Sequence, residues 1–308
     1  MALLVKFNPK VLLSNSRNIP SRFVHSVQSV KLSYDEYLPK NLEVAEEASP
    51  LLIMHGLFGS RQNWRGISKR LTQVLNPSRR ILSIDARNHG QSPHSLEHTY
   101  THMAEDIKDL ISNIPKAEKV VLLGHSMGGR CMMYFCLEYP ELVESAIIVD
   151  ISPFSNVHFT GSTDKMSELL RKLKDIPLDP NVAPSAARKM VDQEIRDIMP
   201  DQATRDFILL NLYKSEAGFQ WRFHIDGLLQ NVERSIARFP EEMLQKRFSN
   251  PIMFIGGADS QYINPADLPK MREIFPQVEL EFVANAGHLV HVQKPNEFLD
   301  LVTNFLNR

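Results

Sequence analysis

Residues 119–131 read Lys-Val-Val-Leu-Leu-Gly-His-Ser-Met-Gly-Gly-Arg-Cys. The apolar run at 120–123 predicts a buried strand, and the apolar residues that follow the glycines predict a helix. A Gly-x-Ser-x-Gly sequence between a strand and a helix is typical of a nucleophile elbow, where the serine occupies a strained turn. Gly124 and Gly128 would leave room where the strand and the helix pass closely. The stretch therefore predicts that Ser126 is a nucleophile at the edge of a sheet.

The composition is that of a globular protein of 308 residues, with 43% hydrophobic and 23% charged residues. A formal net charge of -1 gives no indication of a nucleic-acid partner. No apolar run approaches the length of a transmembrane helix. Cys131 and Cys136 lie five residues apart on one predicted helix and so on different faces. We therefore expect no disulfide and a reducing compartment.

Residues 1–29 have the composition of a mitochondrial transit peptide, or otherwise of a disordered basic leader. Five basic residues precede Asp35, the first acidic one, and serine recurs throughout. The basic residues are Lys6, Lys10, Arg17, Arg22 and Lys31. We expect a mitochondrial protein whose folded part begins near Val30.

Strand and helix patterns alternate along most of the remaining chain. Strands are expected at 50–55, 80–85, 146–149, 251–255 and 278–283, and a further one near 30–34. Helices are expected at 101–114, 265–275 and 296–306. This alternation predicts an α/β fold with a mostly parallel central sheet and flanking helices, formed by residues 30–308.

Residues 154–249 interrupt this alternation with helical patterns only. We interpret them as a helical cap inserted over the active edge of the sheet, because the strand–helix pattern resumes directly afterwards. A separate helical domain is the alternative. The cap is expected to supply an apolar wall above the nucleophile through Phe207, Leu210, Leu212, Trp221 and Phe223. Trp221 and Phe223, together with Phe58, are the candidate substrate-binding residues.

A serine nucleophile needs a general base, and His288 is the candidate. It follows Gly287 after the last expected strand, with only a terminal helix beyond it. The order Ser126, acid, His288 is the one found in α/β-hydrolases. His291 is the competing histidine, and we expect it to support the site or contact the cap.

Three aspartates could orient the base. Asp259 follows the strand before the histidine strand, which is the usual position, and is preferred. Asp150 ends the strand next to the elbow strand and could also reach the imidazole. Asp226, late in the cap, is the third candidate. Each of them could instead be a turn-forming or helix-capping carboxylate.

An oxyanion hole is expected from two backbone N–H groups. One belongs to Met127, directly after the nucleophile. The other is assigned to Leu57 in the His55-Gly56 loop, with Phe58 as the close alternative. In the loop at 85–92, Arg87 and His89 are expected to be structural hydrogen-bonding residues.

Four motifs together resemble the α/β-hydrolase superfamily and, within it, the family of α/β-hydrolase domain-containing protein 11. They are His-Gly-Leu-Phe-Gly-Ser at 55–60, Asp-Ala-Arg-Asn-His-Gly at 85–90, Gly-His-Ser-Met-Gly-Gly at 124–129 and Asn-Ala-Gly-His at 285–288. The resemblance extends from about Val30 to the C-terminus. It implies a mitochondrial serine hydrolase of the matrix with ester and lipid activity, diacylglycerol hydrolysis included, and a link to a lipoyl-bearing 2-oxoacid dehydrogenase complex.

The same resemblance bears on the acid. Members of that family often carry Asn where this chain has Asp259, which shifts the acid role to residues that match Asp150 or Asp226. The usual aspartate is present here, so all three candidates stay open.

The sequence thus predicts a serine hydrolase that cleaves carboxylic, lipid-type esters through an acyl-serine intermediate. The alternatives are a thioesterase, or a weakly catalytic partner that binds and protects a dehydrogenase complex. A small-molecule ester or lipid is the expected substrate. No metal-ligand cluster or phosphate-binding loop is visible, so we expect no metal and no cofactor.

Overall fold

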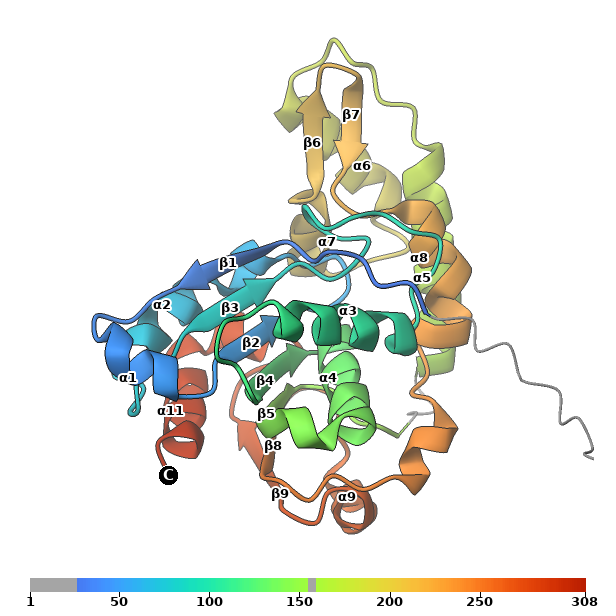
Figure 1. Cartoon of the computed structure of the whole chain (residues 1–308). Helices are drawn as coiled ribbons and strands as arrows, with labels where there is room; N and C mark the ends of the chain where they lie inside the picture. The colour runs from blue at the N-terminus through green and yellow to red at the C-terminus, as the bar shows by residue number, and fades with distance from the viewer. Residues whose placement is uncertain (1–26, 155–158) are drawn as a thin grey trace, which may run out of the picture.

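A computed structural model describes residues 27–154 and 159–308 of the chain. Most of the expected leader, residues 1–26, lies outside this part. A seven-stranded sheet runs through the molecule in the order β1-β3-β2-β4-β5-β8-β9, with β1 alone antiparallel to its neighbour (Figure 1). The strands are β1 (Tyr34–Tyr37), β2 (Leu51–Met54), β3 (Ile81–Ile84), β4 (Val120–His125), β5 (Val143–Val149), β8 (Ile252–Gly257) and β9 (Val278–Val283). The predicted mostly parallel α/β sheet is confirmed.

The central strands consist mostly of apolar residues because both faces of the sheet are covered. In β2, Leu51 and Ile53 belong to one hydrophobic core, whereas Leu52 and Met54 belong to the other. All four side chains are fully buried. This alternation explains why the sequence shows continuous apolar runs here rather than a period of two.

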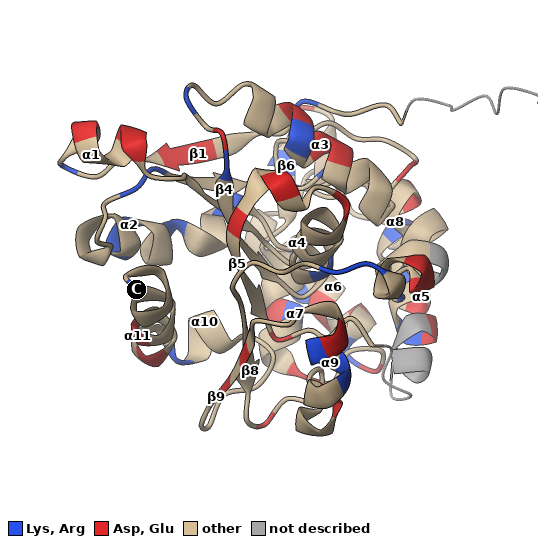
Figure 2. Ribbon diagram, turned by 60° about the horizontal axis from the view of Figure 1, so that its bottom comes forward, with Lys and Arg blue, Asp and Glu red and all other residues tan. Residues whose placement is uncertain are grey.

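Helices on both faces build the two cores (Figure 1). One face is covered by α2 (Arg65–Val74) and α11 (Pro295–Leu306), and the other by α3 (Tyr100–Ser112), α4 (Met127–Glu138) and α9 (Leu268–Ile274). Short elements complete the body: α1 (Leu42–Glu47), η1 (Arg61–Trp64), η2 (Pro140–Leu142), η5 (Pro265–Asp267) and α10 (Val290–Gln293). Charges of both signs are spread over outer helices such as α3, α5 and α9 (Figure 2). Both cysteines lie buried and unpaired in α4.

The segment between β5 and β8 lies beyond the sheet, beside its active edge (Figure 1). Its helical elements are α5 (Phe159–Asp175), α6 (Pro184–Ile195), α7 (Gln202–Leu209), α8 (Ile225–Asn231), a π-helical turn η3 (Val232–Ile236) and η4 (Glu241–Gln245). It also contains an antiparallel hairpin of β6 (Leu212–Ser215) and β7 (Gly218–Trp221). The expectation of helices alone is therefore wrong, because α7 ends at Leu209 and the chain turns back at Gly218, whose φ is 102°.

Gly128 sets how closely α4 packs on β2. A Cβ atom built at this glycine would lie 2.5 Å from the carbonyl oxygen of His55 and 2.7 Å from that of Met54. Both obstacles are backbone atoms of a buried strand end, which cannot move aside without disturbing the sheet. The first turn of α4 is therefore held against the loop that follows β2.

Replacing Gly128 with alanine should destabilise the protein by about 1–3 kcal/mol, because the added methyl overpacks a backbone contact. Gly66 is the matched control, since it lies in α2 with nothing within 4 Å of an added Cβ. There alanine should raise the free energy of unfolding by up to about 1 kcal/mol. Urea denaturation of both variants measures the difference, and equal effects at the two positions would contradict the packing argument.

Candidate active site

Ser126 occupies a strained turn between β4 and α4. Its backbone has φ 53° and ψ -118°, a conformation that non-glycine residues rarely adopt. The turn is held from both sides, since the Ser126 N–H donates to Val149 O at 3.0 Å and its carbonyl accepts from Arg130 N at 3.0 Å. The serine therefore stands at the carboxyl end of the central strand, in the geometry expected of a nucleophile elbow.

His288 and Asp150 form a hydrogen-bonded pair beside this turn. His288 follows β9, Asp150 directly follows β5, and the imidazole Nδ1 lies 2.7 Å from the carboxylate Oδ2. The Asp150 side chain is fully buried and also accepts from Gly257 N, at 3.0 Å, and from Ser260 Oγ. A carboxylate can only accept, so Nδ1 of the imidazole is the donor in this bond, and in the neutral ring Nε2 is then the acceptor.

The structure corrects the preference for Asp259 as the partner of the base. Asp259 is an exposed residue whose backbone N–H donates to Ala286 O at 2.9 Å. Asp226 is bound to Lys174 at 2.6 Å, and this hydrogen bond lowers the pKa of the Asp226 carboxyl. Neither of these carboxylates contacts the imidazole among the described interactions of His288, whereas Asp150 does.

Strand order and a close backbone crossing explain why Asp150, and not Asp259, contacts His288. β5 lies between β4 and β8, so a carboxylate at its end is next to the elbow strand. The chain after β9 crosses directly over Gly257, where a Cβ atom would lie 2.3 Å from Gly287 O and 2.4 Å from Ala286 O. Because this crossing is so tight, His288 is brought over the end of β5.

The N–H groups of Leu57 and Met127 have no acceptor among the described residues, and both residues line the same cavity as Ser126. The alternative donor, Phe58 N–H, instead donates to Nε2 of His89 at 3.3 Å. This bond separates the two sequence candidates, because a donor already satisfied by a buried ring is less available to an oxyanion. Leu57 and Met127 are thus the pair whose N–H groups are free for this role.

Two buried neutral histidines hold the loop that contains Leu57. His55 Nε2 accepts from Ala86 N at 3.1 Å, so its other nitrogen carries the proton that is donated to Gly56 O at 2.7 Å. His89 is arranged in the same way, accepting from Phe58 N and donating to Arg87 O at 3.0 Å. Burial lowers the pKa of His55 and takes that of His89 well below its usual value. Both rings are therefore fixed structural links.

A third neutral histidine, His125, positions the base. Its Nε2 donates to the backbone carbonyl of His288 at 2.9 Å, and burial holds its pKa well below the usual value. The ring of His291 lies 4.9 Å from that of His125 and stacks on Trp64 at 4.1 Å. His291 is thus buried behind the site and supports His125; it does not contact the cap segment through these rings.

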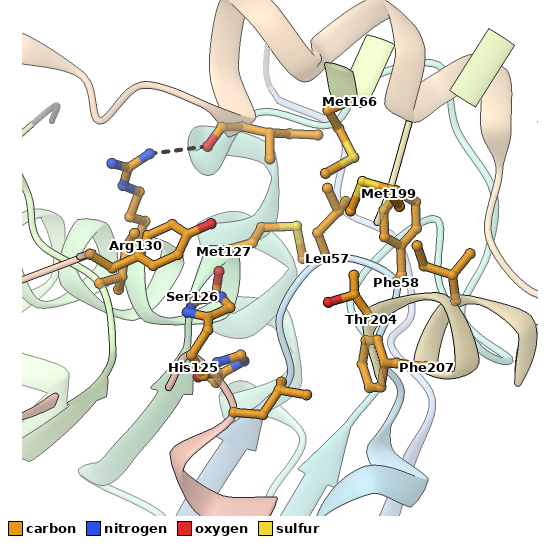
Figure 3. A pocket seen from close by; sticks show the side chains of 16 residues that line it. Leu57, Phe58, His125, Ser126, Met127, Arg130, Met166, Met199, Thr204 and Phe207 are labelled. Carbon is orange, nitrogen blue, oxygen red and sulfur yellow. Dashed lines mark hydrogen bonds between the residues drawn. The ribbon is translucent and has the colours of Figure 1, made fainter. Parts of the chain in front are cut away.

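Ser126 and His288 open onto one cavity of about 280 Å³ (Figure 3). Its remaining wall is mostly apolar, and the segment between β5 and β8 supplies much of it through Met166, Met199, Thr204, Phe207, Ile208 and Ile236. Phe58 and Phe207 line the cavity as predicted. Four other expected contributors, Leu210, Leu212, Trp221 and Phe223, are not among its described lining residues.

Phe223 and Trp221 lie behind this wall. The ring of Phe223 is buried 4.9 Å from that of Phe58 and 5.1 Å from that of Trp221. Leu210 is 65% exposed. The two methionines of the inserted segment that line the cavity, Met166 and Met199, carry no signal in the sequence beyond their helical spacing.

Arg130 also lines the cavity and was not singled out by sequence. Its buried guanidinium donates to the carbonyls of Ala237, at 2.7 Å, and Ile236, at 3.3 Å. Its Nε donates to Ser152 O at 3.3 Å. This side chain therefore joins α4 to the far end of the inserted segment.

No group of three or more His, Cys, Asp or Glu residues in the described part of the chain could hold a metal ion. No helix among the described residues is both long and apolar enough to span a membrane.

Comparisons with known proteins agree with this architecture. Residues 49–295 match the alpha/beta hydrolase fold family. The sn-1-specific diacylglycerol lipase ABHD11 of Mus musculus is 36% identical over 270 residues, which cover 87% of this chain and 85% of the mouse protein. Abhydrolase domain-containing protein C22H12.03 of Schizosaccharomyces pombe is 32% identical over 285 residues, covering 92% and 99%.

A solved structure of a marine microorganism esterase is similar to the whole fold. It has a TM-score of 0.74 at 30% identity and covers 90% of this chain and 100% of its own. The sheet, the elbow and these relatives together lead to one conclusion: the chain belongs to the alpha/beta hydrolase fold family and is a hydrolase.

Proposed function

We propose that this protein is a serine hydrolase that cleaves carboxylic esters of the lipid type through an acyl-serine intermediate. The observation that carries the proposal is the hydrogen bond between His288 and Asp150, formed at the wall of the cavity onto which Ser126 opens. A serine alone is a poor nucleophile at neutral pH and needs a base held in one tautomer. The buried carboxylate supplies that constraint.

Each residue then has a role in the reaction. Ser126 Oγ attacks the ester carbonyl carbon while His288 Nε2 takes the hydroxyl proton, and Asp150 stabilises the imidazolium that forms. The oxyanion is stabilised by the N–H groups of Leu57 and Met127. The proton passes to the departing alcohol as the C–O bond breaks, which leaves an acyl-serine. Water, deprotonated by His288, then attacks the acyl carbon and releases the acid and Ser126.

The apolar wall of the cavity supports an acyl chain as the occupant. Burying a methylene group gains about 0.8 kcal/mol, so a longer acyl chain should bind better until the cavity is full. The mouse relative is named a diacylglycerol lipase, which makes a diacylglycerol the substrate to examine first. A thioesterase would use the same acyl-serine, so the acyl cavity supports it equally. A weakly catalytic binding partner is disfavoured by the complete set of catalytic groups.

The inserted segment, residues 154–249, is proposed to act as the cap, because it supplies the cavity wall opposite the sheet. A mitochondrial location is proposed from the leader composition and from the family resemblance. The suggested link to a dehydrogenase complex rests on that resemblance alone.

Replacing Ser126 with alanine should leave the fold intact and lower ester hydrolysis by several orders of magnitude, because no acyl-enzyme can form. The measurement is hydrolysis of p-nitrophenyl hexanoate, together with labelling by a fluorophosphonate probe. Circular dichroism controls for folding. A variant that kept more than about a tenth of the activity would exclude this mechanism.

Replacing Asp150 with asparagine should lower kcat about a thousand-fold or more, because the imidazole tautomer is no longer fixed. Asp259→Asn is the matched control, and its activity should stay within about three-fold of the natural chain, since Asp259 is exposed and makes no described contact with the imidazole. Comparable large losses in both variants would argue against Asp150 as the acid.

Replacing Met199 with alanine should move the preferred acyl chain toward greater length, because it enlarges the apolar end of the cavity. Phe223→Leu should lower the melting temperature and leave the preference unchanged, since Phe223 packs behind Phe58. Rates on p-nitrophenyl esters from acetate to palmitate measure both effects. An unchanged profile in Met199→Ala would remove the cap from chain-length selection.

A further inference from the structure

A second cavity, of about 410 Å³, lies against the first one. Phe58 and Phe207 line both cavities, so their two rings form the partition between them. Figure 3 shows both rings on the side of the catalytic cavity that is opposite Arg130. The second cavity therefore begins one side chain away from the catalytic cavity.

The two rings that form this partition, Phe58 and Phe207, differ in how firmly their side chains are held. The backbone of Phe58 is fixed by a bond from its N–H to His89 and by a bond from Asn211 Nδ2 to its carbonyl at 2.8 Å. Its ring packs on Phe223. Phe207 is half-buried and has no ring stacking partner among the described residues. Rotation of the Phe207 side chain is thus the simpler way to join the two cavities.

The linings also differ in chemistry. The catalytic cavity is mostly apolar, whereas the second cavity is lined mainly by polar side chains from η1, from the loop after β3 and from the cap. An ester has an acyl half and an alcohol half. Since the apolar cavity suits the acyl chain, the more polar cavity next to it suits a polar leaving group.

Most of the charge in this second cavity is already paired. Arg61 donates from Nε to Asp35, from Nη1 to Asp85 and from Nη2 to Gln91. The Asp85 carboxylate also accepts from the backbone N–H groups of Arg61 and Gln91. These groups saturate one another, so they form a rigid floor with little capacity for a ligand.

Arg222 is the exception. It is an exposed residue on the wall of the second cavity, with its guanidinium 4.6 Å from the centre of the Tyr213 ring. It has no carboxylate partner among the described residues. A guanidinium that stacks on an aromatic ring keeps its N–H edge available to bind an anion.

We propose that the second cavity is the leaving-group chamber, and that it takes an alcohol with an anionic group, a carboxylate or a phosphate, bound by Arg222. This inference rests on the proposed ester hydrolysis and deepens it by naming the class of leaving group. The acyl chain lies in the apolar cavity, the carbonyl at Ser126, and the alcohol chain passes Phe207 into the chamber.

The test compares hexanoyl esters of three alcohols: 1,6-hexanediol, 6-hydroxyhexanoate and 6-hydroxyhexyl phosphate. Released hexanoate is measured by chromatography. For the natural chain, kcat/KM for the anionic esters should be about three- to ten-fold above kcat/KM for the neutral ester. This ratio should fall at high salt, because salt screens the attraction between Arg222 and the anion. A larger ratio for the phosphate than for the carboxylate identifies phosphate as the preferred anion, and the reverse identifies carboxylate.

Arg222→Gln should lower the ratio of kcat/KM for the anionic esters to kcat/KM for the neutral ester to about one. The rates on the neutral ester and on p-nitrophenyl hexanoate should stay unchanged. Arg222→Lys should retain part of the preference for anionic esters. Lys214→Gln is the control, because it removes the same charge from β6, the strand paired with β7 just before Arg222, at an exposed residue that does not line the chamber. This variant should keep the natural ratio.

Equal kcat/KM values for charged and neutral esters in the natural chain would contradict the proposed leaving-group chamber. An equal loss of the preference for anionic esters in Lys214→Gln and in Arg222→Gln would contradict it as well. Hydrolysis of p-nitrophenyl hexanoate without turnover of any of the three esters would overturn it too. The proposed function fails separately, if Ser126 is not labelled by the fluorophosphonate probe or if Ser126→Ala still hydrolyses p-nitrophenyl hexanoate.

Discussion

The catalytic geometry depends on how closely the backbone of α4 approaches the ends of β2 and β4. Ser126 adopts a backbone conformation that costs roughly 1–3 kcal/mol, and such strain persists only where the surroundings over-determine it. Here a Cβ atom at Gly124 would lie 2.5 Å from Gly128 O, and one at Gly128 would lie 2.5 Å from His55 O. Because every contact in this series is made by backbone atoms, the turn has no room to relax. The strain is therefore the means by which the serine is held beyond the sheet edge with the next N–H free.

Neutral histidines form much of the polar structure around this turn. Burial lowers the pKa of His98 to about 3, and the rings of His55, His89 and His125 are held neutral in the same way. This matters to the base, since the ring of His125 lies 4.6 Å from that of His288. A charged neighbour at that distance would oppose the imidazolium that forms during attack. The surrounding rings thus supply directional hydrogen bonds without adding charge.

The sequence was informative where local pattern determines structure. Strands buried on both faces appear as apolar runs, and the elbow and the histidine loop appear as short glycine motifs next to such runs. The hairpin Leu212–Trp221 was missed because each of its strands has only four residues, too few for a period of two to stand out, and because the first strand begins soon after the end of α7. The preference for Asp259 as the partner of His288 was not matched by the structure, because Asp150 and Asp259 each follow a strand, and only the strand order and the crossing at Gly257 decide which one meets the imidazole. The cavity wall depends on how cap side chains pack in three dimensions, which periodicity does not specify.

The position of Asp150 directly after β5 determines which parts of the site are rigid. Ser126 and Asp150 stand at the ends of two hydrogen-bonded neighbouring strands, with Ser126 N bound to Val149 O next to Asp150. The histidine alone arrives on a loop, and three contacts restrain it: the Asp150 carboxylate, the donor from His125, and the ring of Tyr262 stacked at 4.0 Å. Tyr262 comes from the loop after β8, the position where an acid was expected. Because Asp150 rather than Asp259 binds the imidazole, that loop can serve as a wall of the cavity and as a platform for the ring of His288, which it does through Tyr262.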